Sequence, residues 1–347
     1  MTPSGGGAPA SPNPGLEPPS PGGRLILASV GLGTFLSAIS GSTINLALPA
    51  LGKELHLSVG ESSGVILSFL LAIGIALIPA GRIGDMFGHR RGYLAGFLLF
   101  GVGSIGAGVA WGYASLLASR VLQGIGGAMA LATSTAILTT SFHESRRGGA
   151  LGLLGSATYA GLTLGPPVGG LILWLGDWRW TFLMNVPACA AILWMGARCL
   201  PRDPERKPAG FDLAGTAADF LGLFRSRVFA GAAASALCNY AGLFGAIFLL
   251  PFYLIEGLGK SPRESGFLLM AQPIVMALVA FPAGRLSDRI GTRGLATGGM
   301  LVLAAGLAGL STLGPDARTP AVASWLAVMG LGMGTFVSPN SSTLMGA

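Results

Sequence analysis

The sequence is short of charge, cysteine and histidine. Only 10% of its 347 residues are Asp, Glu, Lys or Arg, and it contains three cysteines and three histidines. The cysteines show no CxxC spacing and the histidines are not paired, so we expect neither a disulfide framework nor a metal site. The sequence also lacks HExxH, GxSG and any acidic pair inside an apolar run. These absences argue against an enzyme and against a cofactor.

The few charges are unevenly spread. The formal net charge is +7, but the basic residues lie between apolar runs and form no continuous basic arm or face. This distribution excludes a nucleic-acid partner.

Half of the residues are hydrophobic, and many apolar runs reach the roughly 20 residues that a helix needs to cross a bilayer. The sequence therefore predicts an all-α integral membrane protein with the lipid bilayer as a partner. Ten spans are expected, at 25–48, 62–80, 92–111, 114–140, 150–174, 181–200, 228–254, 265–283, 294–313 and 321–345.

Residues 1–23 are mainly Pro, Gly, Ser and Ala, and this composition predicts a disordered tail. With Arg24 in the cytoplasm, 15 Lys and Arg residues fall in loops on that side and five on the other. By the positive-inside rule this asymmetry predicts a cytoplasmic N-terminus and a multi-pass protein of the cytoplasmic membrane.

Two charged loops interrupt the apolar runs with the same pattern. GRIGDMFGHRR at 81–91 and GRLSDRIGTR at 284–293 share Gly, Asp and Gly at positions 203 residues apart. A Pro in a similar apolar context recurs at Pro49 and Pro251, 202 residues apart. Such offsets indicate an internal duplication with parallel halves.

These motifs resemble the major facilitator superfamily, whose loop between spans 2 and 3 carries a Gly-x-x-x-Asp-x-x-Gly-basic-basic signature. RVLQGIGGA at 120–128 is similar to its span 4 motif, and GLTLGPPVGG at 161–170 to its antiporter motif. INLALP at 44–49 and DWRWTFLMNVP at 177–187 look like the drug:proton antiporter branch that normally has 14 helices. The resemblance implies a parallel duplicated helical bundle, in which the two charged loops act as gates. Their residues are Gly81, Asp85, Gly88, Arg90, Arg91, Gly284, Asp288, Arg289, Gly291 and Arg293.

The glycine spacing of the antiporter motif has a physical meaning of its own. Gly161, Gly165 and Gly169 recur every four residues on one helical face, where another helix can approach closely. In the family this span seals the interface between the halves; the remaining motif residues are Pro166, Pro167 and Gly170. GVGSIG at 101–106 fits a nucleotide-binding pattern, but it lies inside an apolar span without a preceding strand, so it predicts no nucleotide site.

Arg120 is the one basic residue that falls within a span, and an intramembrane guanidinium usually faces a cavity or an acid. It is the best candidate for transport and coupling, with Gln123 one turn away. The alternative is an arginine that snorkels to the interface. The drug-exporter branch commonly carries a proton on an Asp in span 1, and the alignment of INLALP puts Ser40 there. No obvious intramembrane acid is left to carry a proton.

A substrate cavity can be sketched from polar residues amid apolar ones. Ser37, Ser40 and Thr43 follow one another at every third position of span 1. The other candidates are Asn45, Thr133, Asn239 and Tyr240. Sparse polar groups in apolar walls favour bulky amphipathic compounds. Any one of the hydroxyls could instead bond its own helix.

The expected organisation is a six-helix bundle at 24–200, a cytoplasmic linker at 201–227 and a second bundle at 228–347 with four helices. FDLAG at 211–215 resembles the start of an extra helix pair, for which no room follows. By the 203-residue offset, the second half looks truncated before spans 11 and 12.

The sequence thus predicts a secondary transporter that exports drug-like amphipathic small molecules by alternating access, with the proton as coupling ion. The alternative is a sensor-like or transport-inactive relative that has lost coupling, favoured by the absent acid.

Overall fold

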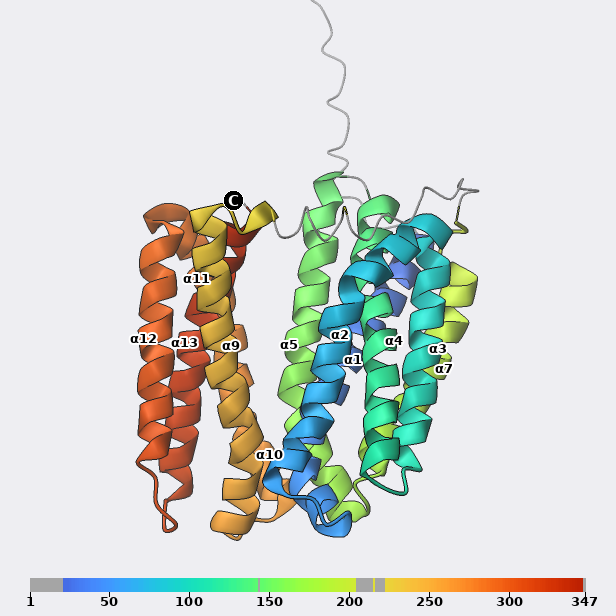
Figure 1. The fold of residues 1–347 in the computed structure, drawn as a ribbon. Helices are drawn as coiled ribbons and strands as arrows, with labels where there is room; N and C mark the ends of the chain where they lie inside the picture. Colours follow the sequence, from blue (N-terminus) through green and yellow to red (C-terminus); the bar gives the residue numbers. More distant parts are fainter. Residues whose placement is uncertain (1–20, 143, 204–214, 216–221, 346–347) are drawn as a thin grey trace, which may run out of the picture.

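A computed structural model describes residues 21–142, 144–203, 215 and 222–345. Every regular element in this part of the chain is helical (Figure 1). The first half holds α1 (Pro21–Glu54), α2 (Val59–Phe87), α3 (His89–Gly108), α4 (Tyr113–Ser141), α5 (Glu144–Leu175), α6 (Trp180–Leu183) and α7 (Asn185–Cys199). The second half holds α9 (Arg227–Phe252), the π-helix η1 (Tyr253–Gly257), α10 (Pro262–Leu269), α11 (Ala271–Ile290), α12 (Thr292–Ser311) and α13 (Thr319–Met345). The predicted helical class is confirmed.

Eight helical stretches of the described chain are long and apolar enough to cross a membrane by length and composition. In them α6 joins α7, α9 joins η1, and α10 joins α11. The glycine-rich helices α3 and α5 lie among these stretches in the same bundle (Figure 1). Helices therefore occur in all ten ranges that the sequence predicts as spans.

One predicted boundary differs from the structure, and another lies mostly outside the described residues. The tail was expected to reach residue 23, but α1 begins at Pro21, where a proline suits the first helical turn because its missing N–H would have no partner there. Residues 1–20 lie outside the described residues, as do 204–214 and 216–221 of the predicted linker.

The internal duplication is visible in the ends of the helices. Ser58 and Glu61 form a capping box at the start of α2, and Ser261 and Glu264, each 203 residues further on, form the same box at α10. In each box the Ser hydroxyl accepts the Glu backbone N–H and the Glu carboxylate accepts the Ser backbone N–H. Gly88 and Gly291, also 203 residues apart, both adopt positive φ, at 106° and 89°.

Glycine contacts between helices repeat as well, with a slightly different offset. Gly126 of α4 lies against the backbone of α3, and Gly332 of α13 lies against that of α12. Gly124 and Gly330 of the same helices face α2 and α11 respectively. Each pair is 206 residues apart, so three more residues separate Gly291 from Gly332 of α13 than separate Gly88 from Gly126 of α4.

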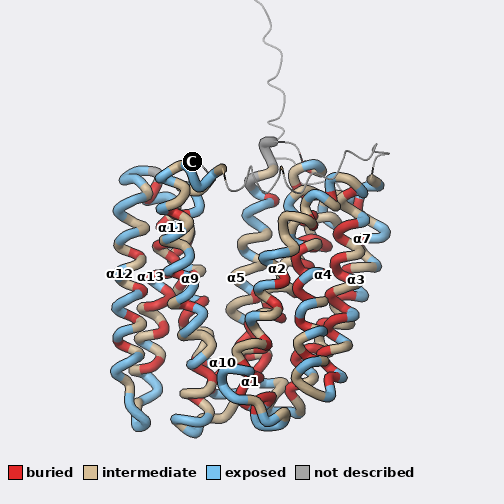
Figure 2. Tube along the Cα trace, in the orientation of Figure 1, coloured by how far each residue is buried: buried red, intermediate tan, exposed pale blue. Residues whose placement is uncertain are grey.

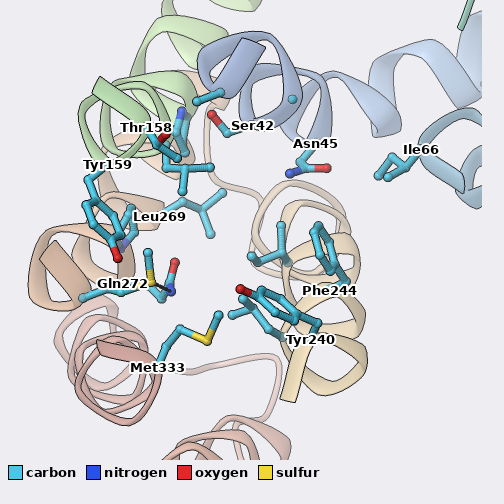
Figure 3. Close-up of a pocket in the computed structure, with 18 of the residues that line it drawn as sticks. Ser42, Asn45, Ile66, Thr158, Tyr159, Tyr240, Phe244, Leu269, Gln272 and Met333 are labelled. Atoms are coloured by element: carbon cyan, nitrogen blue, oxygen red, sulfur yellow. Dashed lines mark hydrogen bonds between the residues drawn. The ribbon is translucent and has the colours of Figure 1, made fainter. Parts of the chain in front are cut away.

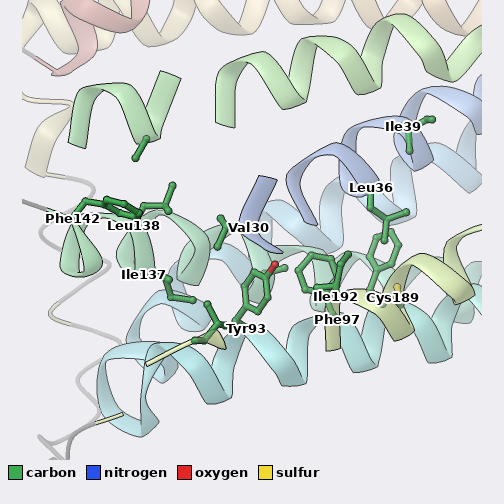
Figure 4. Packing of buried hydrophobic residues seen from close by; sticks show 14 of the residues in the cluster. Val30, Leu36, Ile39, Tyr93, Phe97, Ile137, Leu138, Phe142, Cys189 and Ile192 are labelled. Atoms are coloured by element: carbon green, nitrogen blue, oxygen red, sulfur yellow. The ribbon is translucent and has the colours of Figure 1, made fainter. Parts of the chain in front are cut away.

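Buried side chains lie between helices, whereas the outer faces, which would contact lipid, are largely exposed (Figure 2). One apolar cluster joins α1, α3, α4 and α7 around Tyr93 and Phe97 (Figure 4). The centroids of these two rings lie 4.8 Å apart in an edge-to-face arrangement. The Tyr93 hydroxyl donates to the Ser29 carbonyl at 2.8 Å. A second apolar cluster lies between the helices from α9 to α13. It includes Tyr159 and Leu162 of α5, so α5 belongs to the contact between the halves.

Candidate functional site

A cavity of about 490 Å³ lies between the two halves (Figure 3). Apolar side chains form most of its wall. α1 contributes Ser37, Ser42 and Asn45, while α9 contributes Tyr240 and Phe244. The remaining lining residues are Ala38, Gly41, Ile66, Phe69, Leu70, Arg120, Gly155, Thr158, Tyr159, Leu162, Pro166, Leu243, Ile247, Leu250, Leu269, Gln272, Pro273, Met276, Leu326, Met329, Met333 and Val337. Such a wall suits a bulky, largely apolar ligand with a few polar groups.

Arg120 borders this cavity and is fully buried. Its Nε donates to the Val65 carbonyl at 3.1 Å, and its Nη1 donates to Gln123 Oε1 at 2.8 Å. The guanidinium carbon lies 4.1 Å from the centre of the Phe69 ring and 5.7 Å from that of Phe182. Nη2 has no hydrogen-bond partner. Arg120 is therefore held within the bundle by neutral groups and does not snorkel to the interface.

A chain of buried hydrogen bonds leads away from Arg120 across four helices. Gln123 Nε2 donates to Ser104 Oγ of α3 at 2.7 Å. Asn185 Nδ2 of α7 donates to Ser40 Oγ of α1 at 3.0 Å and lies 3.5 Å from Ser104 Oγ. Asn185 Oδ1 has no partner. This network ties Ser40 to Arg120 through intervening side chains and leaves two buried polar atoms available for a further partner.

The predicted site residues fall into three places. Ser37, Asn45, Tyr240 and Arg120 line the cavity. Ser40 and Gln123 belong to the buried network.

Thr43, Thr133 and Asn239 lie outside the cavity, contrary to expectation. The Thr43 hydroxyl donates to the Ile39 and Gly165 carbonyls, that of Thr133 to the Met129 and Ala130 carbonyls of its own helix, and Asn239 Nδ2 to Met300 Sδ.

The error at span 1 has a geometric cause. Residues three apart on an α-helix are offset by about 60°, so a row of such steps drifts around the helix. The face of α1 at the cavity instead follows steps of four residues, with Ser37, Gly41 and Asn45 in one row and Ala38 and Ser42 in the next. Ser40 consequently points to α7 and Thr43 to α5.

Sequence reasoning missed Ser104, Asn185 and Gln272. Ser104 lies inside GVGSIG and Asn185 inside DWRWTFLMNVP, two stretches already singled out for other reasons. Each of these residues is an amide or a hydroxyl within an apolar run, and this feature of the sequence could have identified them. It does not show, however, on which face of the helix the polar group lies.

The antiporter motif lies between two neighbours. Gly161, Gly165 and Gly169 face α1, where an added Cβ would come within 3.0 Å of α1 atoms. Gly170 faces the backbone of Pro262 and Arg263 at the start of α10, and Gly266 of α10 faces Pro166 and Pro167 in return. α5 therefore packs tightly against both its own half and the other one.

The first charged loop, predicted at 81–91, is helical in the structure except for Gly88: it comprises the end of α2 and the start of α3. Asp203 Oδ1 accepts the backbone N–H of Arg90 at 3.0 Å, and its Oδ2 accepts that of Arg91 at 3.1 Å. A carboxylate at a helix N-terminus is stabilised by the unpaired amides and the helix dipole. Two features favour glycine at position 88: its φ is positive, and an added Cβ would collide with Asp203.

The carboxylate at this helix start comes from Asp203, which follows α7, while the carboxylate of Asp85 lies 3.7 Å from His89 Nε2. Arg90 Nη2 donates to the Ala197 carbonyl at 2.6 Å. In the second loop Gly284 packs against Ser338, while the side chain of Asp288 lies outside the described residues.

At the opposite end of the bundle the halves meet directly. Lys53 of α1 lies 3.3 Å from the Glu256 carboxylate of η1, and Phe248 and Phe252 of α9 pack on an apolar cluster that includes Leu51. In Figure 1, α5 and α9 lie further apart at the end that carries the charged loops.

The family model of the Major Facilitator Superfamily matches residues 30–347. The chain belongs to this superfamily. It is accordingly a multi-pass membrane transporter. The membership that the sequence motifs predicted is confirmed.

Several curated relatives are transport or resistance proteins. The riboflavin transporter RibZ of Clostridioides difficile (strain 630) is 26% identical over 92% of this chain and 80% of the relative. The tetracenomycin C resistance and export protein of Streptomyces glaucescens is 29% identical over 88% of this chain. The chain spans 66% of that relative's length.

A solved structure shares the fold. It is a bacterial homologue of the human lysosomal transporter Spinster, in an inward-facing, unoccupied conformation, with a TM-score of 0.77. The two chains are 19% identical over 94% of this chain and 76% of the other, so the likeness speaks for the fold alone.

Proposed function

We propose that this transporter exports drug-like amphipathic small molecules across the cytoplasmic membrane by alternating access. The carrying observation is the central cavity, which takes residues from both halves and whose wall is apolar except for a few polar groups. A ligand in it would touch both halves, so rocking of the halves would change the side to which it is exposed. The name of the tetracenomycin C resistance and export protein supports the same substrate class.

The charge distribution supports an inward-facing arrangement. The loops with most Lys and Arg lie at the end where α5 and α9 are apart, and the positive-inside rule puts that end in the cytoplasm together with the N-terminus. A single cysteine at the exposed Gly149, in a background without the native cysteines, should react only with thiol reagents that enter the cytoplasm. Labelling by an impermeant reagent from outside intact cells would contradict this orientation.

The driving force is proposed to be the proton gradient, which has a chemical and an electrical part. No carboxylate is present among the lining residues that the structure describes, so a coupling proton would bind elsewhere. In proteoliposomes, nigericin collapses the pH difference and valinomycin with potassium sets the potential, so each part can be imposed separately.

The decisive experiment is counterflow of a fluorescent amphipathic compound into proteoliposomes. Met333→Trp, which fills the cavity wall, should strongly reduce uptake, whereas Leu301→Trp on the exposed face of α12 should not. Uptake that is equal in both variants, or equal to that of empty liposomes for the unchanged protein, would contradict the proposal.

A sensor-like protein without transport is the second candidate, favoured by the lack of a carboxylate in the described cavity wall. It would bind the compound with the same dependence on Met333 but show no counterflow.

A further inference from the structure

The cavity has an unbalanced positive charge at its wall. Among the lining residues, Arg120 is the charged one, and Asp, Glu and Lys are absent from the part of the wall that the structure describes. Tyr159, Tyr240, Gln272 and Asn45 are polar but neutral. A ligand in the cavity therefore meets a cationic site without a fixed counterion.

The contacts of Arg120 are all with neutral groups. They comprise the Val65 carbonyl, the Gln123 amide and the rings of Phe69 and Phe182, and no carboxylate in the described chain pairs with this guanidinium. Arg120 lines the cavity, and its buried Nη2 lacks any hydrogen-bond partner. A buried charge without a paired group is costly, so an anion that reaches it gains more than it would in water.

The acid that would neutralise Arg120 is also missing from the network. Ser40 at its far end is a hydroxyl, held by Asn185, and Gln123 beside the guanidinium is an amide. No described side chain supplies a negative charge to Arg120, so a ligand in the cavity is the group that could supply it.

The remaining wall suits a flat ring system. The centroids of the Tyr240 and Phe244 rings lie 6.4 Å apart, with the rings at 34° to each other, and Met276 and Met333 line the same cavity; Figure 3 shows Met333 near Tyr240. Aromatic rings and flexible thioethers pack well on planar apolar surfaces.

We propose that the cavity selects planar aromatic organic anions, such as aromatic carboxylates and acidic phenols, over lipophilic cations, with the acidic group directed at Arg120. As a statement about substrates it rests on the proposed transport function; as a statement about binding it stands by itself.

The test is equilibrium binding to the protein in nanodiscs of neutral lipid, with empty nanodiscs subtracted. The probes share one ring system: 9-anthracenecarboxylic acid is anionic at neutral pH, 9-(aminomethyl)anthracene is cationic and anthracene-9-carboxamide is neutral. A charge-assisted hydrogen bond predicts that the acid binds about 10-fold or more tightly than the amine. Equal affinities, or tighter binding of the amine, would overturn the proposal.

Gln123→Glu sharpens the test, because the new carboxylate would replace an amide whose oxygen lies 2.8 Å from Arg120 Nη1. This intramolecular counterion should remove the preference for the acid over the amine. Persistence of the preference would show that Arg120 is not its origin. If the variant does not fold, the comparison of probes on the unchanged protein still decides the proposal.

Transport separates this proposal from the previous one. Counterflow of the amine but not of the acid would support a transporter and contradict anion selection. Tight binding of the acid without any counterflow would support anion selection and contradict the transport function.

Discussion

Arg120 and Leu326 occupy equivalent positions on α4 and α13, as the glycine pairs 206 residues apart on these helices show. Gln123 is matched in the same way by Met329. The glycines keep the same contacts in both halves, whereas the residues at these two pairs of positions differ completely in polarity. Helix packing was thus retained after duplication because each half needs close approach of its helices, while the polar chemistry is concentrated in the first half.

The largest expected effect comes from exchanging the two cavity residues. Arg120→Leu should reduce saturable uptake by about 30-fold or more, because the anchor of the ligand is lost. Adding Leu326→Arg should not restore uptake, since Leu326 has no Gln123-like amide beside it. Proteoliposome uptake at equal protein content measures both.

Arg120→Lys refines this prediction, because an ammonium cannot reproduce the planar fork that contacts Val65 and Gln123. Uptake should remain well below that of the unchanged protein. Near-normal uptake by Arg120→Leu would show that the halves do not differ in function at this position.

A second prediction tests the shared packing. Gly126→Ala and Gly332→Ala should each destabilise the protein by about 1–3 kcal/mol, because the new methyl group meets backbone atoms of the neighbouring helix. Gly298→Ala on α12, where an added Cβ meets nothing within 4 Å, is the matched control. Thermal unfolding in detergent would measure all three. A loss in only one half would break the proposed equivalence.

A third, smaller effect concerns the starts of α3 and α12. Asp203→Asn should cost about 1 kcal/mol, because a carboxylate that accepts two backbone N–H groups is replaced by a weaker, neutral acceptor. Hydrogen exchange at the Arg90 and Arg91 amides should speed up, while exchange at the start of α12 stays constant. Unchanged exchange at α3 would show that the cap does not protect this helix end.

The smallest effect is expected where the halves meet at the end opposite the charged loops. Lys53→Gln and Glu256→Gln each remove an exposed ion pair, and such pairs contribute about 0–1 kcal/mol and weaken with salt. Gly266→Leu, by contrast, would place a side chain against Pro166 and Pro167 of α5. This substitution should strongly disrupt the packing between the two halves. Thermal unfolding at low and high salt separates the effect of the ion pair from that of the packing. An ion-pair variant that lowers stability as much as Gly266→Leu would contradict this prediction.

The failures of prediction at the site share one origin. Thr133 and Asn239 were chosen because they are polar residues in apolar spans, yet neither lines the cavity: the Thr133 hydroxyl donates to a carbonyl of its own helix, and Asn239 Nδ2 donates to Met300 Sδ. Gln272, which was not chosen, lines the cavity. Polarity alone does not distinguish these cases, because the rotation of each helix about its axis is set by its neighbours.

The sequence by itself determined the features that depend on local composition and spacing. The apolar runs, the duplicated charged loops and the four-residue glycine period of α5 could all be read directly, because bilayer thickness and helical periodicity act on each segment separately. Tertiary structure decided the contacts between segments. Asp203, which follows α7, reaches the start of α3, and Arg120 is surrounded by Val65, Gln123 and two aromatic rings instead of an acid. Such contacts join residues up to 113 positions apart, and they form only where packed small residues fix how far apart and at what rotation the helices lie.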